Sequence, residues 1–308
     1  MAGNQTTSIE SYIVAYYALT LMIVGTILNL LTFVILCRSS FRDTKTRPTL
    51  HYMRTIAIFD ILMLYGWNLD HYLVTAHNFR ILRYSLGSCK FICFLSYVTP
   101  QTSAWLRVFV SLDRYLSLSR RTRTWFNQSK PILITIICVI VVFILLNLHI
   151  LIFGCYYQKN NIINAQAASY KIYPLWDYVN LGVYNCAPFI CLVVLNSGVI
   201  YHLIDLRRTT TIQNSRIRHR PITLTLVITT FLFLTMTIPA TVAYAFFSTI
   251  NETLLHFLDG ILYTYHVLSF VLYFITFREF RQECIGMVTR RRINHIKVQP
   301  QLNTPMPS

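Results

Sequence analysis

The chain has 308 residues, of which 55% are hydrophobic and only 12% are charged, and its formal net charge is +16. Soluble domains carry about twice that charged fraction, so the composition excludes an ordinary soluble protein. The positive charge does not indicate nucleic-acid binding, because the basic residues gather in alternate loops between apolar segments. No nucleic-acid partner is therefore expected.

Seven apolar stretches follow one another along the chain. They approach or exceed the roughly 18–20 residues that a helix needs to cross a bilayer. Backbone groups in lipid must be bonded internally, and the runs do not alternate as barrel strands do, so helices are expected. We predict an all-α membrane protein, a single seven-transmembrane helix bundle over residues 12–277. The expected spans are 12–37, 50–74, 88–112, 132–154, 178–204, 221–247 and 254–277.

The basic residues predict the orientation of the chain. Lys and Arg are concentrated after the first, third, fifth and seventh spans, and the other loops hold few of them. Such segments lie on the cytoplasmic side, so residues 1–11 are expected outside and the C-terminus inside. Asn4 and Asn251 stand in Asn-X-Thr triplets of outer segments and are expected glycosylation sites.

The segment after the last span predicts a further helix. Over residues 278–289, Phe280, Cys284 and Met287 recur at helical spacing beside basic residues. This pattern is typical of a short amphipathic helix on the inner membrane surface, in contact with lipid. Residues 290–308 are expected to form a disordered cytoplasmic tail.

Two cysteines are expected at the outer face. Cys89 lies at the outer end of the third span, and Cys155 begins the loop after the fourth. Because that side is oxidising, a disulfide between them is expected, with two free thiols as the alternative. No Cys/His spacing suggests zinc, and neither a metal nor a cofactor is expected.

Polar residues inside spans cost free energy and indicate function. Asn29, Asp60, Ser103 and Arg107 form such a set. An arginine at mid-membrane depth needs a partner, and Asp60 is the nearest acid, so we expect an ion pair. The alternative is an arginine satisfied by backbone carbonyls and water. The set contains no acid pair, His cluster or Ser/Lys dyad, so an enzyme is not expected.

An ordered series of motifs runs through the spans. Residues 25–29 read GTILN and residues 56–60 read IAIFD, and Cys89 precedes Arg114 by 25 residues. The series continues with Asp113-Arg114-Tyr115, Pro188, Phe233, Pro239 and Tyr273. On these residues the chain resembles the rhodopsin-like family of G-protein-coupled receptors, with a look closest to invertebrate neuropeptide receptors of the FMRFamide type.

The resemblance implies roles for these residues. Asp113 and Arg114 would form an inner lock, and with Tyr115 and Tyr273 they would serve coupling to a heterotrimeric G protein. A static topology anchor is the alternative for the acid–arginine pair. The resemblance also implies helix bending during activation at Pro188, Phe233 and Pro239, and a location in the plasma membrane.

The chain departs from the family pattern at two motifs. Thr237 stands where the family has a tryptophan, and Ser269-Phe270 replace its Asn-Pro. These losses put the family's usual toggle and its sodium pocket in doubt.

The ligand expectation also comes from the outer half of the spans. Retinal and amines are disfavoured, because Tyr263 and Ser96 replace the lysine and aspartate that those ligands require. Acids beside aromatic residues suit a cationic or amidated peptide, although solvated helix ends are the alternative. A receptor for a small non-amine ligand and a multi-span transporter are the other functions considered. The expected ligand pocket comprises Asp70, Ser96, Tyr97, Asp259 and Tyr263.

Overall fold

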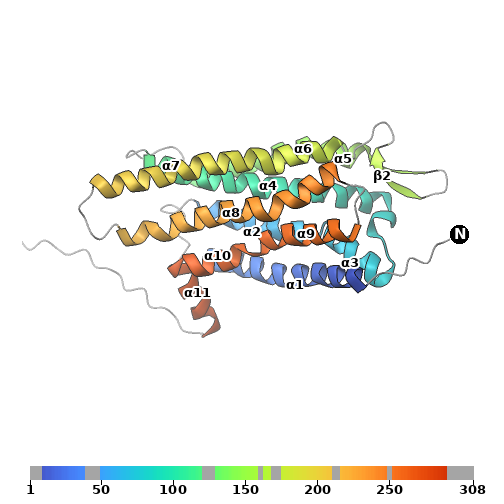
Figure 1. The fold of residues 1–308 in the computed structure, drawn as a ribbon, viewed down its shortest axis with the longest axis horizontal. Helices are drawn as coiled ribbons and strands as arrows, with labels where there is room; N and C mark the ends of the chain where they lie inside the picture. The colour runs from blue at the N-terminus through green and yellow to red at the C-terminus, as the bar shows by residue number, and fades with distance from the viewer. Residues whose placement is uncertain are drawn as a thin grey trace, which may run out of the picture.

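The structure is a computed structural model that describes residues 9–38, 49–119, 129–158, 162–167, 175–209, 216–247 and 252–289. The sequon residues Asn4 and Asn251 and the tail 290–308 lie outside these ranges. The described chain is almost entirely helical, and its long helices run side by side along one axis (Figure 1).

The elements follow the expected order along the chain. The first four rods are α1 (Ile9–Cys37), α2 (Leu50–Leu64) with α3 (Trp67–His77), α4 (Leu86–Ser119) and α5 (Ser129–Phe153). A 3-10 turn η2 (Ile81–Arg83) and the strands β1 (Gly154–Tyr157) and β2 (Ile163–Ala167) lie in the intervening loops. The remaining elements are α6 (Leu175–Asn180), η4 (Leu181–Cys186), α7 (Ala187–Thr209), α8 (Arg216–Phe246), α9 (Glu252–Val267), α10 (Ser269–Thr276) and α11 (Arg278–Val288).

Five segments of the described chain are long and apolar enough to cross a membrane. They correspond to the first and the fourth to seventh predicted spans: Ile9–Cys37, Ser129–Phe153, Leu175–His202, Ile228–Phe246 and Thr253–Thr276. The predicted second span is instead divided into two short helices, and α4 holds Lys90, Arg107, Asp113 and Arg114. The second rod is therefore absent from this set because its two helices are too short. The third rod is absent because it is too polar.

Two of the predicted spans, the second and the seventh, are interrupted in the structure. The second rod breaks between Leu64 and Trp67, where a Cβ on Gly66 would lie 2.7 Å from the Ser96 hydroxyl of α4. Glycine at this point allows the close approach of the two helices. The seventh rod breaks at Leu268, between α9 and α10. The fifth rod stays helical but changes to a π-helix in η4, a form found frequently at functional sites.

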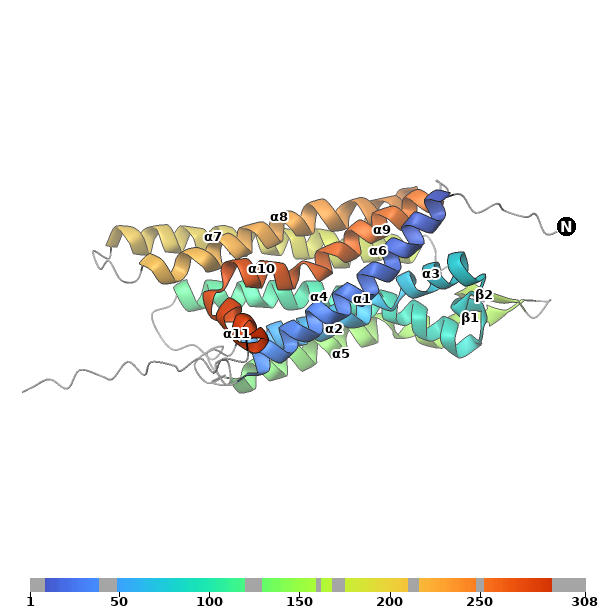
Figure 2. The same cartoon turned by 90° about the horizontal axis from the view of Figure 1, so that it is seen from below.

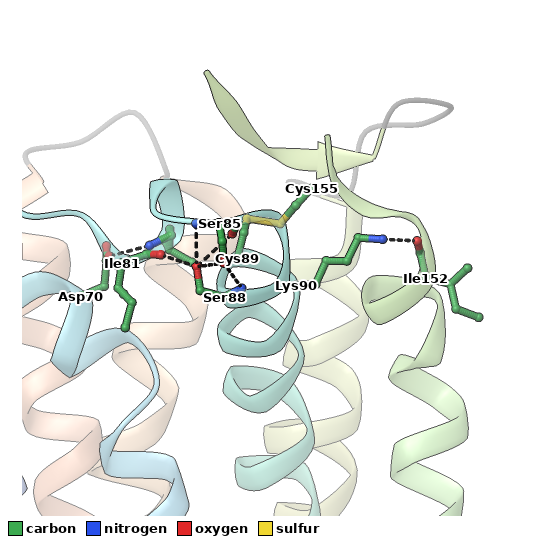
Figure 3. The surroundings of a disulfide bond; sticks show 9 residues. Asp70, Ile81, Ser85, Ser88, Cys89, Lys90, Ile152 and Cys155 are labelled. Atoms are coloured by element: carbon green, nitrogen blue, oxygen red, sulfur yellow. Dashed lines mark hydrogen bonds between the residues drawn. A yellow bond between two sulfur atoms is a disulfide. The ribbon is translucent and has the colours of Figure 1, made fainter. Parts of the chain in front are cut away.

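The end of the bundle at which α1 begins, which we call the outer end, carries a small antiparallel hairpin, β1–β2, which the all-α prediction missed. The predicted disulfide between Cys89 and Cys155 is present and ties this hairpin to the start of α4 (Figure 3). Next to it, Lys90 Nζ donates to the Ile152 carbonyl at 2.7 Å. These two links bring the hairpin over the outer ends of α4 and α5.

The opposite end carries α11, which turns away from the bundle axis (Figures 1 and 2). Phe280 of this helix is only 1% exposed and packs in a cluster with Ile35, Leu36 and Leu50. The predicted helix after the last span thus forms at 278–288, and its apolar stripe docks on α1 and α2.

The outward faces of the long helices are apolar. On α5, Ile134, Ile137 and Leu145 are about 60% exposed, whereas buried polar residues point inward. An exposed apolar surface of this kind is stable in lipid and unstable in water. The described bundle therefore exposes apolar side chains and buries polar ones at its centre, which is the reverse of a soluble protein.

Candidate functional site

A buried polar cluster occupies the middle of the bundle and is centred on Asp60 of α2, which is fully buried. From α4, Ser103 Oγ donates to Asp60 Oδ1 at 2.6 Å and Arg107 Nη2 donates to Asp60 Oδ2 at 2.7 Å. From α9, His266 Nδ1 lies 2.8 Å from Asp60 Oδ1. Arg107 Nη2 also donates to Ser269 Oγ of α10 at 3.2 Å. We call these five residues the polar core.

Local sequence explains how the core assembles. Ser103 and Arg107 are four residues apart and share one face of α4, where Arg107 also donates to the Ser103 hydroxyl. His266 and Ser269 stand on either side of the Leu268 break, which lets both side chains reach Asp60. The Arg107 guanidinium lies 5.1 Å from the Tyr265 ring centroid, a cation–π contact. The ion pair expected from the sequence is thus present, with more partners than expected.

The polar core continues into the fifth rod. His266 Nε2 lies 3.0 Å from the Tyr184 hydroxyl, and both side chains are buried. A neutral imidazole that donates from Nδ1 to Asp60 accepts at Nε2, so Tyr184 is the donor. The chain Asp60–His266–Tyr184 therefore connects α2, α9 and η4 through one histidine.

The neighbours of Tyr184 in η4 bond two further helices. The Val183 carbonyl accepts from Trp105 Nε1 of α4 at 2.9 Å. Asn185 is fully buried: its Oδ1 accepts from Thr237 Oγ1 at 2.7 Å and its Nδ2 donates to Thr241 Oγ1 at 2.6 Å, both on α8. Three consecutive residues of the π-helix thus bond α4, α9 and α8.

Two residues predicted to serve activation lie against this segment. Phe233 of α8 is fully buried, with its ring edge-on to Tyr184 at 5.9 Å between centroids. Thr237, found where the family resemblance implies a tryptophan, bonds Asn185. At the position where the family resemblance implies the toggle tryptophan, the chain therefore has a threonine that links α8 to η4 by a hydrogen bond. Pro188 is buried at the second position of α7, directly after η4, and Pro239 is exposed on α8.

Below the polar core lies a cavity that extends from Arg107 to Arg114. It receives side chains from the second, third, fifth, sixth and seventh rods. Its lining also includes Ser111, Thr229, Tyr265, Ser269 and Tyr273, together with the apolar Met53, Ile56, Val110, Leu192, Leu272 and Phe277. We call it the inner cavity.

The predicted inner-lock residues lie beside this cavity. Asp113 is buried and accepts a hydrogen bond from Thr49 Oγ1 at 2.6 Å, which ties α4 to the start of α2. Arg114 and Tyr273 line the cavity itself. Tyr115 packs instead against Gly198 of α7, where an added Cβ would lie 2.6 Å from its ring.

Four of the five residues of the predicted ligand pocket form two groups. Asp70 accepts from the Leu82 backbone at 3.1 Å, and Ser96 donates to the Ile92 carbonyl at 2.8 Å, so both bond the backbone. Tyr97 and Asp259 each form a hydrogen bond with another side chain. Tyr263, one turn below Asp259, is 4% exposed.

Two outer carboxylates are each bonded by a tyrosine. Tyr97 OH donates to Asp177 Oδ1 at 2.9 Å, and Tyr244 OH donates to Asp259 Oδ2 at 2.6 Å. The two carboxylates are close enough for an electrostatic interaction between them. Across the described ranges, neither acid forms an ion pair with a Lys or Arg. We call Asp177 and Asp259 the outer acids.

Sequence reasoning missed His266, Tyr184 and Asn185. A histidine inside an apolar span is an intramembrane polar residue, and that rule alone could have found His266. It also missed Pro100 inside α4. Asn29, which was predicted, donates from Nδ2 to the His266 carbonyl at 3.4 Å and so belongs to the edge of the core.

Comparison with known proteins gives a family match. The family model described as "Serpentine type 7TM GPCR chemoreceptor Srw" matches residues 16–171, just over half of the chain. The matched region includes Asp60, the disulfide cysteines, Arg107 and Arg114. No curated protein matches the chain.

Proposed function

Because the chain belongs to the Srw family of serpentine chemoreceptors, a G-protein-coupled receptor family, we propose that it is a cell-surface receptor that crosses the plasma membrane seven times. In this proposal an extracellular ligand binds at the outer acids, and a heterotrimeric G protein binds at the inner cavity. The chain is a signalling protein and not an enzyme. The observation that carries the proposal is the continuous set of buried contacts between these two ends.

The path of coupling follows those contacts. Asp177 of α6 stands one turn before η4, and Asn180 at the end of α6 accepts from Gln101 of α4 at 2.9 Å. A ligand that moves α6 also moves Tyr184 and Asn185, which hold α9 and α8. Buried polar contacts of this kind give discrete alternatives, and a ligand shifts their populations only by its differential affinity.

The ligand is inferred from the charge of its site. Two carboxylates, Asp259 buried and Asp177 half-buried, each with a tyrosine, favour a ligand that carries an ammonium or guanidinium group. A cationic or amidated peptide fits this chemistry and is the ligand that we propose. A small cationic chemosensory ligand fits the same acids and the family's description as chemoreceptors. The peptide and the small molecule are separated by experiment.

The test is G-protein dissociation in cells that express the full chain. A panel of G-protein classes is measured against amidated cationic peptides, small cations of matched charge, and neutral analogues. We expect one class to dissociate with the cationic ligands and not with the neutral ones. Arg114→Ala is expected to abolish the response at unchanged surface expression, because the inner cavity then lacks its lower cation.

Each outcome has a defined meaning. A response to small cations but not to peptides replaces the proposed peptide with a small chemosensory ligand. Ion flux or solute uptake that does not need a G protein contradicts the receptor function and favours a transporter. Unaltered signalling by Arg114→Ala contradicts the assignment of the inner cavity.

A further inference from the structure

Three sulfur atoms meet at the outer end of α4. Cys89 and Cys155 form the disulfide, and Cys93 lies one helical turn deeper on the same face as Cys89. The Sγ atoms of all three lie within 4.8 Å of one another, and each residue is at most 4% exposed. Cys93 is not disulfide-bonded. A thiol is thus held beside the disulfide that secures the outer hairpin.

The helix geometry explains this proximity. Side chains of an α-helix lean toward its N-terminus, so the Cys93 sulfur reaches back toward the level of Cys89. Figure 3 shows Cys89 on the first turns of α4 and the disulfide extending from it to Cys155. The Cα atoms of the bonded pair are 6.2 Å apart. The Cys93 and Cys155 sulfurs already lie within 4.8 Å of each other, which is less than the ~5.4 Å of one helical turn, so a shift of the hairpin by less than one turn brings Cys155 to Cys93.

The backbone of Cys155 is a second, independent observation. Its φ is 60°, in the left-handed region that L-residues seldom occupy, and the β1–β2 register is irregular between Gly154 and Tyr156. Such a conformation is unfavourable for a residue other than glycine and persists only where the surroundings impose it. The disulfide therefore attaches the hairpin through a residue whose backbone is in an unfavourable conformation, at the irregular point of the β1–β2 register.

We propose that Cys93 is an exchange thiol for the outer disulfide. The Cys93 thiolate attacks Sγ of Cys155, a Cys93–Cys155 bond forms, and the Cys89–Cys155 bond breaks. The electron pair of the broken bond stays on Cys89 Sγ, which takes up the proton that Cys93 releases. No oxidant or reductant is consumed, because one thiol and one disulfide are present both before and after the exchange. The chain then has two disulfide isomers that differ in the depth of the hairpin attachment.

The exchange is placed to affect the outer half of the bundle. Cys155 and Ile163 of the hairpin pack in one apolar cluster with Cys93 and Tyr97, against which Trp176 also packs. Tyr97 bonds Asp177, the residue after Trp176. A deeper hairpin in the second isomer therefore presses on α6 beside one of the outer acids. The isomers are expected to differ in the exposure of Asp177, whatever ligand binds there.

Disulfide mapping of the purified full chain tests the proposal. Trypsin cleaves after Lys90 and so separates Cys89 from Cys93. Thiols are trapped with N-ethylmaleimide at acidic pH before digestion, and linked peptides are identified by mass spectrometry. Cys138→Ala is the background, because Cys138 otherwise shares the tryptic peptide of Cys155. We expect a major Cys89–Cys155 species and a minor Cys93–Cys155 species.

A second variant keeps the test decisive. In Cys89→Ala the Cys93–Cys155 disulfide is expected to become the main species and to retain most of the surface expression. Cys89→Ala/Cys93→Ala is expected to lose expression to the level of Cys155→Ala. The proposal is overturned if the Cys93–Cys155 peptide is absent from both the Cys138→Ala chain and the Cys89→Ala variant. If Cys89→Ala is not expressed, the absence of the Cys93–Cys155 peptide from the Cys138→Ala chain is enough to overturn the proposal.

Discussion

At the scale of single residues, Arg107 decides the chemistry of the polar core. Its guanidinium lies 2.7 Å from the fully buried carboxylate of Asp60 and also bonds both neighbouring serines. A buried carboxylate is costly without a cation, and here the cation is part of the chain. The polar core therefore needs no cation from solution.

Removal of that guanidinium is the first prediction. Arg107→Met keeps an unbranched, flexible side chain, although a shorter one, and leaves Asp60 buried without its cation. We expect a loss of about 3–5 kcal/mol of stability, since breaking one partner of a buried pair leaves an uncompensated charge. Thermal unfolding of the detergent-solubilised receptor measures this loss. We further expect added sodium to raise the melting temperature of Arg107→Met and to leave that of the native chain unchanged.

The double variant Asp60→Asn/Arg107→Met is the matched control, because it removes both charges of the pair. It is expected to recover most of the stability lost in Arg107→Met and to show no effect of sodium. Equal losses in the single and double variants would mean that Arg107 stabilises the bundle by packing and not through Asp60.

At the scale of elements, η4 connects the others. Its side chains and carbonyls bond α4, α9 and α8 from three consecutive positions. Each backbone hydrogen bond of a π-helix spans one more residue than in an α-helix, which brings neighbouring residues to faces that regular winding would not offer. The coupling that we propose depends on this segment because it touches three rods at once.

The Tyr184 hydroxyl provides the second prediction. Tyr184→Phe keeps the ring against Phe233 but removes the hydrogen bond to His266. A buried hydrogen bond contributes about 1 kcal/mol, which corresponds to about a fivefold change in an equilibrium. We expect ligand-free signalling per surface receptor, or the half-maximal ligand concentration, to change by about that factor. Concentration–response curves in cells provide the measurement.

Tyr201→Phe is the control for this substitution, because the Tyr201 ring is 69% exposed on α7 and belongs to neither the polar core nor η4. It is expected to signal like the native chain. A Tyr184→Phe receptor with native curves would show that the Asp60–His266–Tyr184 chain is structural and does not carry coupling.

The sequence predicted these elements unevenly, for physical reasons. Apolar runs located the rods. Asp60, the nearest acid, was identified as the partner of Arg107, because the free-energy cost of a charged side chain in lipid leaves few alternatives. The bond between Tyr184 and His266 depends on how α9 and η4 are rotated against each other, which a single sequence does not specify. The π-helix likewise has no local signal, since the residues that fix it bond other helices. Asp70 and Ser96 looked like pocket residues because their internal partners, Leu82 and Ile92, are backbone groups.

At the scale of the whole molecule, two independent features support the same orientation. The disulfide and hairpin lie at one end of the bundle, where α1 begins, and α11 lies at the other (Figure 2). A stable disulfide belongs on the oxidising side of the membrane. Clusters of Lys and Arg belong on the cytoplasmic side, and they follow the first, third, fifth and seventh spans. Charge and redox chemistry therefore agree without depending on each other.

The third prediction of this Discussion concerns that orientation. An epitope tag before Met1 is expected to bind antibody on intact cells, whereas a tag after Ser308 is expected to bind only after permeabilisation. Seven crossings require the two tags to lie on opposite sides, and five or seven crossings give the same result. A third tag inserted after Phe79, between the second and third spans, separates these cases. With seven crossings it is extracellular, because α2–α3 returns the chain to the outer side. If α2–α3 and α4 did not cross, that tag would bind antibody only after permeabilisation, and the seven-span architecture would be wrong although the terminal tags behaved as expected.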